Sequence, residues 1–270
     1  MTTYSNAGLR RIAPLFDEVD AGRLTLPEPI DRLRTAHRSL AVQLDAMAVP
    51  AQPDSVVYEL TDRILADAEN RAPLPEVDEI AATRARTEAG EILYTAAHAA
   101  AASLEERLAG AVHGRADQLI ADTLAPPFAK LLDDLHRVAS TLHGHDLDPV
   151  VVLSAPDRVR KARIELDTIA GRYDTLRRIQ AALSPYSAVA LDIDGVFTEM
   201  SDRLDHLPLA NFISKPRPPW PEDQSLRLLW LVEHDCKLWM PTGPQRDEAY
   251  RVALPDSPAV KGRHPLAHIT

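Results

Sequence analysis

Five stretches of the chain carry apolar residues at alternating steps of three and four positions. This spacing gives a helix one apolar stripe, here called a seam, and is typical of helices that pack on one another as in coiled coils. Polar His37 and Gln180 each occupy one seam position, where such residues usually set the register of pairing. The apolar members of the three clearest seams are Ile30, Leu33, Leu40, Leu44 and Met47; Phe128, Leu131, Leu135, Val138 and Leu142; and Val159, Ala162, Leu166, Ile169, Tyr173, Leu176 and Leu183.

Prolines and glycines set the expected ends of these helices. No proline occurs between Pro75 and Pro126, so this stretch predicts one long helix that can bend at Gly110–Gly114. Pro126-Pro127 is expected to kink or break it, because each proline removes a backbone donor. The other predicted helices are 8–20, 28–48, 54–70, 128–143 and 157–183.

The composition changes at Ser184-Pro185. The last 86 residues hold 11 of the 22 prolines and all three tryptophans. Short strands are expected in this part at 188–193 and, after a short helix, within 226–240; a further short strand is expected at 149–153. The sequence thus predicts a mainly α fold: an elongated antiparallel bundle of coiled-coil-like helices with a small irregular α+β C-terminal unit. The expected divisions are an N-terminal segment (1–27), the bundle (28–184), a Pro/Trp-rich docking unit (185–256) and a tail (257–270).

Composition narrows the classes of function. The net charge of −10 argues against non-specific nucleic-acid binding, which needs a basic surface. The single cysteine excludes an internal disulfide and fits a reducing compartment. No signal-peptide core or membrane-length apolar run is found, so we expect a cytoplasmic or particle-assembled protein. High Ala and Arg with five Lys is typical of a high-GC genome, such as that of an actinobacterium or one of its phages.

The sharpest local motif is Leu-Asp-Ile-Asp-Gly-Val-Phe-Thr-Glu at 191–199. It resembles the first motif of the haloacid dehalogenase phosphatase superfamily. The resemblance implies that Asp192 is the nucleophile and Asp194 the general acid/base, with Mg²⁺ bridging carboxylate and phosphate. That family also needs a doubly wound sheet and a later lysine, and the proline-rich remainder of the chain has no alternating βαβ pattern. The competing interpretation is a strand that ends in an Asp-Gly turn at Gly195.

His143, His145 and Asp148 form a weak candidate metal cluster, because His and carboxylate at short spacing suit Zn²⁺. They partly resemble the His-x-His-x-Asp-His pattern of metallo-β-lactamase-like hydrolases, although Leu147 stands where that Asp belongs. The alternative is a helix C-terminus, capped by Gly144 and followed by a turn. We expect no metal and no cofactor.

Two groups of residues are candidate interface positions. Trp220, Trp230 and Trp239 lie beside a polyproline-like segment, and Trp is enriched at binding hot spots. The alternative is that they build the core of the C-terminal unit. Leu166, Ile169 and Tyr173 are the central positions of the longest seam.

The preferred hypothesis is a non-enzymatic structural or assembly protein: a scaffold, an adaptor or a virion or capsid-type component. It would act through helix seams and the Trp/Pro-rich docking unit. Its partners would be proteins, in a homo-oligomer or a larger assembly, with no direct nucleic-acid or membrane contact. The alternative is a Mg²⁺-dependent phosphohydrolase that uses Asp192 and Asp194.

Overall fold

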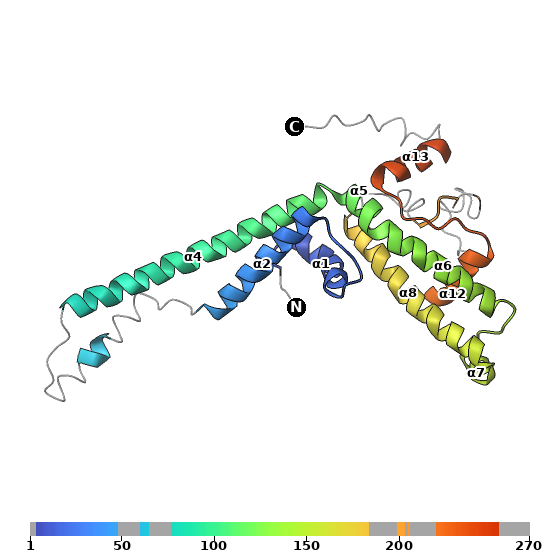
Figure 1. Cartoon of the computed structure of the whole chain (residues 1–270), viewed down its shortest axis with the longest axis horizontal. Coiled ribbons are helices and arrows are strands. Elements are labelled where there is room, and N and C mark those ends of the chain that lie inside the picture. Colours follow the sequence, from blue (N-terminus) through green and yellow to red (C-terminus); the bar gives the residue numbers. More distant parts are fainter. Residues whose placement is uncertain are drawn as a thin grey trace. The chain divides into compact units, whose positions relative to one another are not determined.

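The computed structural model describes residues 4–47, 60–64, 77–183, 199–202, 205 and 220–253. These residues are mainly helical, as the seams predicted (Figure 1). Among them no helix is long and apolar enough to cross a membrane. The chain divides into two compact units: unit 1 (Met1–Arg10 and Glu28–Ala111) and unit 2 (Arg11–Pro27 and Val112–Thr270).

Unit 1 contains α2 (Glu28–Ala46), most of α4 (Val77–His113) and the start of α1 (Ala7–Asp20). Asn6 caps α1: its side-chain oxygen accepts hydrogen bonds from the amides of Gly8 (2.8 Å) and Leu9 (3.2 Å). Such a cap satisfies donors that have no partner inside the helix. The predicted helices 8–20 and 28–48 are confirmed with small shifts at their ends.

The helix α4 changes character along its length. No described side chain from Ala81 to Leu104 is buried, whereas Glu105 and Leu108 are. α2 lies beside the C-terminal part of α4 (Figure 1). The predicted long helix is therefore confirmed up to His113, and it ends in the glycine region where a bend was expected.

The second stretch of unit 2, from Val112, holds a continuous run of helical residues: α5 (Ala116–Leu119), the π-helix η1 (Ile120–Leu124) and α6 (Ala125–Leu142). Pro126-Pro127 was predicted to kink or break the helix, and the run of helical residues does not end there. The Ala125 amide donates to the carbonyl of Ile120, five residues back, and both prolines then fall at the first positions of α6, where no donor is needed. The π turn thus accommodates the prolines without ending the run.

The core of unit 2 lies between α6 and α8 (Asp157–Leu183), which pack side by side (Figure 1). Every apolar position of their two seams is buried. The largest fully buried side chains include Leu131, Leu135 and Tyr173. The spacing of three and four therefore identified the buried face of both helices.

One local prediction is wrong, and another is confirmed for its helix but not for a full strand. The segment at 149–153 is not a strand but part of α7 (Pro149–Ser154), because Asp148 caps it by accepting from the Val150 amide at 2.8 Å and Pro149 suits a first turn. The expected helix and strand within 226–240 resolve into α12 (Gln224–Glu233) and an isolated bridge between Met200 and Leu238.

A further C-terminal helix, α13 (Gly243–Ala253), was not predicted. α12 packs against α6 and α8. Several predictions concern residues outside the described ranges: most of the helix 54–70, the strand at 188–193 with Asp192 and Asp194, and the tail 257–270.

Candidate functional site

A partly buried polar cluster in unit 2 joins the long helices to the C-terminal segment. We call it the Glu199 cluster: Tyr173, Arg177, Glu199 and Arg227. The Tyr173 hydroxyl donates to Glu199 Oε1 at 2.7 Å, and the Arg227 guanidinium forms an ion pair with Oε2. Arg177 donates to the Glu199 backbone carbonyl at 3.2 Å. Residues from α8, α12 and the segment at 199 therefore meet at one carboxylate.

Aromatic rings line this cluster. The Arg177 guanidinium lies over the rings of Phe128 (4.6 Å to the centroid) and Tyr173 (4.9 Å). The Arg227 guanidinium lies 5.7 Å from the centre of the Trp220 ring. A cation over an aromatic face is attracted by the ring quadrupole, most strongly where water is excluded. The rings thus stabilise both arginines in a largely desolvated position.

The chemistry of the Glu199 cluster is that of a structural clamp. Burial raises the pKa of Tyr173, so its hydroxyl stays protonated and acts as a hydrogen-bond donor. Glu199 is held by both this donor and Arg227. Each charge is therefore engaged with another part of the same unit.

Three further polar contacts hold the C-terminal segment in unit 2. The buried Gln180 side chain donates to the Pro241 carbonyl at 2.8 Å, and the Ser225 hydroxyl donates to Asp167 at 2.6 Å. The Gly243 amide donates to Asp117 at 2.7 Å. Gln180 occupies the polar position of its seam, and its side chain thus holds the C-terminal segment to α8.

The pKa of Asp167 reflects its place at this junction. Burial by itself would raise the pKa, but the hydrogen bonds from Ser225 and Arg163 outweigh burial, and the pKa lies below its usual value. The Cys236 thiol shows the opposite balance: burial and the nearby carboxylates raise its pKa to about 11. Cys236 is therefore a poor nucleophile at neutral pH.

The three tryptophans are half-buried and lie around α12. Trp220 and Trp230 have ring centroids 5.8 Å apart, and Trp230 stacks on His234 at 3.7 Å. The fully buried side chains of α12 are its leucines, such as Leu228 and Leu231. It stays a prediction that the tryptophans contact another protein. The same holds for the buried Leu166, Ile169 and Tyr173.

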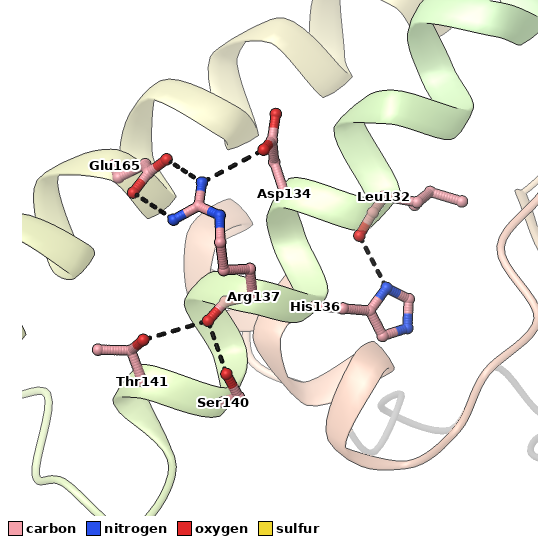
Figure 2. Close-up of polar contacts among 7 residues, drawn as sticks. All are labelled: Leu132, Asp134, His136, Arg137, Ser140, Thr141 and Glu165. Carbon is pink, nitrogen blue, oxygen red and sulfur yellow. Dashed lines mark hydrogen bonds and ion pairs between the residues drawn. The ribbon is translucent and has the colours of Figure 1, made fainter.

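On the surface, α6 and α8 are joined by Arg137 (Figure 2). Its guanidinium reaches Glu165 at 2.5 Å and Asp134 at 3.2 Å. These hydrogen bonds raise the pKa of Arg137, and the Arg137 contact lowers the pKa of Glu165. His136 points away from this group, toward the Leu132 carbonyl at 2.7 Å. The arrangement links α6 to α8.

The candidate metal residues take local roles. His143 caps the end of α6, with its ring 3.7 Å from Glu233, and Gly144 follows with a φ of +75°, which glycine adopts without strain. Asp148 caps α7. Among the described residues, no group of three His, Cys, Asp or Glu side chains is placed to hold a metal ion.

In unit 1 a second buried cluster surrounds Glu105 of α4. Its carboxylate accepts from the Ser5 amide (3.0 Å), the Ser5 hydroxyl (2.5 Å) and the Asn6 amide (2.8 Å). The buried His37 ring lies 3.2 Å from Glu105 and stacks on Tyr4, with ring centroids 5.2 Å apart. Burial by itself would raise the pKa of Glu105, but these hydrogen bonds outweigh it and the pKa is lowered. The cluster ties the start of the chain to α2 and α4.

The most unusual surface of unit 1 is the outer face of α4, defined by Ile92, Leu93 and the small residues around them. Ile92 and Leu93 are 71% and 62% exposed. The other members are also exposed and follow the same three-four spacing: Ala82, Ala85, Ala89, Ala96, Ala99, Ala100 and Ser103. Sequence analysis did not single out this face. The available signal was the absence of any Asp, Glu, Lys or Arg from 92 to 103.

Comparison with known proteins adds no assignment: no family model, curated protein or solved structure matches this chain.

Proposed function

We propose that this chain is a non-enzymatic structural or assembly protein that binds a protein partner through helix–helix contacts. The scaffold, adaptor and virion or capsid-type roles are all of this kind. The observation that carries the proposal is the central part of α4. There residues 92–103 carry no formal charge and are rich in alanine, yet none of the described side chains is buried. The solvent-facing side of a surface helix normally carries charged and polar residues.

The exposed apolar side chains of α4 are large enough for their burial to contribute to the binding of a partner. Fully burying a large aliphatic side chain contributes about 1.5–3 kcal/mol. Ile92 and Leu93 are each roughly two-thirds exposed, so covering both would contribute about 2–4 kcal/mol. The surrounding alanines add area and allow close approach of another helix. Exposed patches of this kind commonly mark interaction sites.

The proposal includes the architecture predicted from the seams, an elongated antiparallel bundle with a C-terminal docking unit. The buried seams of α6 and α8 support the bundle. The Glu199 cluster supports a structural role for the C-terminal segment, because the contacts of Glu199 with Tyr173 and Arg227 hold that segment to α8. A homo-oligomer or a larger assembly would cover α4.

The test is the size of the native particle that contains the chain. The tagged chain, expressed at its natural level in the organism that encodes it, is sized by sedimentation. We expect a particle heavier than one chain. Ile92→Glu should release it, because the change would bury an unpaired carboxylate in the contact.

Ile164→Glu in α8 is the matched control. Ile164 is the same residue type, is 68% exposed, and lies outside both the seam of α8 and the docking unit. It should leave the particle intact. If Ile92→Glu and Ile164→Glu give particles of the same mass as the unaltered chain, α4 is not the contact and the proposal fails.

A further inference from the structure

We propose that the outer face of α4 pairs with the same face of α4 in a second copy of this chain, with the two helices antiparallel and Leu93 near the two-fold axis. This inference rests on the proposed function and names its partner and geometry. It is argued from the spacing of the exposed apolar residues and from the charges at the two ends of the face.

The centre of the face suits self-pairing. In a two-fold interface the same patch meets itself, so any charge on the axis would face its own like. Two chains of net charge −10 also repel one another overall. Residues 92–103 carry no formal charge, which removes the local part of that repulsion.

The sizes of the side chains complement one another in this register. Leu93 meets Leu93 of the second copy, and Ile92 lies against the small Ala96. Farther out, Ala85 and Ser103 lie within about 3 Å of one another along the axis. Ile92 thus faces a small residue, and the small residues on either side of the centre let the helix backbones come close. The half-buried positions of α4, such as Tyr94 and Ala101, lie on another side of the helix and stay available to unit 1.

The charges at the ends select this register. Asp78 and Arg107 are both exposed, 15 residues before and 14 residues after Leu93. In an antiparallel pair centred on Leu93 they lie at the same level, within about 1.5 Å along the axis, and the contact occurs twice by symmetry. Moving the axis to between Ala96 and Ala97 would instead bring Arg86 level with Arg107.

A parallel pair is disfavoured by the same residues. It would place Asp78 opposite Asp78 and Glu106 opposite Glu106, and like charges directly opposed are destabilising. The parallel arrangement would also align the two helix dipoles side by side in the same direction. Antiparallel helices oppose their dipoles, which is the more favourable arrangement.

The first test is the mass of the purified chain as a function of concentration, by sedimentation equilibrium. We expect a monomer–dimer equilibrium. Ile92→Glu should weaken it by at least about 100-fold, because a carboxylate would be buried without a partner. Ile164→Glu, at an exposed position outside the docking unit, should leave it unchanged. A chain that stays monomeric, or an Ile92→Glu variant that dimerises like the unaltered chain, would overturn the self-pairing.

The second test is the direction of pairing, measured by disulfide formation between introduced cysteines. Ala85→Cys alone should not cross-link, since the two copies of position 85 lie about 24 Å apart along the axis. A mixture of Ala85→Cys and Ser103→Cys chains should cross-link. The unaltered chain is the control, because its Cys236 is buried. Cross-linking of Ala85→Cys with itself would show a parallel pair, and cross-linking in none of the samples would exclude pairing through this face.

The two proposals fail separately. A purified chain that is monomeric, together with a native particle that Ile92→Glu releases, would mean that a different protein covers the outer face. Self-pairing would then be wrong and the assembly role would stand. A native chain that sediments as a monomer would remove both.

Discussion

Replacing Leu166 by Ala tests the seam assignment at its most buried position. Leu166 of α8 has no exposed surface and lies in the core of unit 2. Leu→Ala removes three carbons, which corresponds to about 2.4 kcal/mol of transfer free energy. The cavity that remains adds to this, and the measured range for such changes is about 2–5 kcal/mol. We therefore expect a loss of about 2–5 kcal/mol in the free energy of unfolding.

The assay is urea unfolding followed by tryptophan fluorescence. Trp220, Trp230 and Trp239 all lie in unit 2, so this signal reports the unit that contains Leu166. With an m value of about 2 kcal/mol/M, the midpoint should fall by roughly 1–2.5 M. An unchanged m value would show that the variant unfolds by the same transition.

Ile164→Ala is the matched control, two residues away on the same helix. Ile164 is 68% exposed, so this truncation should cost no more than about 0.5 kcal/mol. Arg163→Ala should also cost far less than Leu166→Ala, because its ion pair with Asp167 lies near the surface. Equal, small losses for Leu166→Ala, Ile164→Ala and Arg163→Ala would refute the assignment of the buried face.

Three further predictions concern polar groups. Folding lowers the pKa of Glu105, so the stability that this carboxylate contributes is present above the unfolded pKa of 4.5 and is lost as pH falls through the folded pKa. Glu105→Gln should therefore reduce the stability of unit 1 at pH 7 and weaken the dependence of that stability on acid pH, as measured by hydrogen exchange. A variant whose stability changes with pH just as that of the unaltered chain would contradict this. Tyr173→Phe should cost about 1–2 kcal/mol by urea unfolding, since Glu199 loses a donor, and no loss would show that the hydrogen bond contributes nothing. The chain should not hydrolyse phosphoesters with Mg²⁺, and an activity that vanishes in Asp192→Asn would favour the phosphohydrolase interpretation.

The sequence was sufficient to locate the long helices because their burial is periodic. The helix α8 begins at Asp157 and ends at Leu183, as the spacing and the flanking prolines predicted. Gln180 was expected to be a polar residue that sets the register of pairing; it is buried and donates to the Pro241 carbonyl, and its role in register stays a prediction. Period and proline position are local properties, and a single sequence displays them directly.

The errors arise where a local preference has two structural solutions. Three valines at 150–152 favour a strand, but the Asp148 cap and Pro149 favour a helix start, and the helix formed. Pro126-Pro127 was expected to break the chain of hydrogen bonds, yet one π turn moves both prolines to positions that need no donor. Propensity alone does not decide between such solutions.

The two polar clusters could not be predicted, because they join residues far apart in the chain. Ser5 and Glu105 are separated by 100 positions, and Tyr173 and Glu199 belong to segments of different composition. Nothing in the spacing of either pair indicates a contact. The outer face of α4 is different: its uncharged centre is visible in the sequence, but only the exposure of Ile92 and Leu93 shows that the chain leaves it uncovered.

The central claim is that another polypeptide covers the outer face of α4 in the working protein. The most direct measurement is the rate of maleimide labelling of Ile92→Cys in the native particle, compared with Ile164→Cys in the same particle. The account predicts slow labelling at 92 and fast labelling at 164, with both fast after the particle is dissociated. Equally fast labelling at 92 and 164 in the intact particle would contradict it.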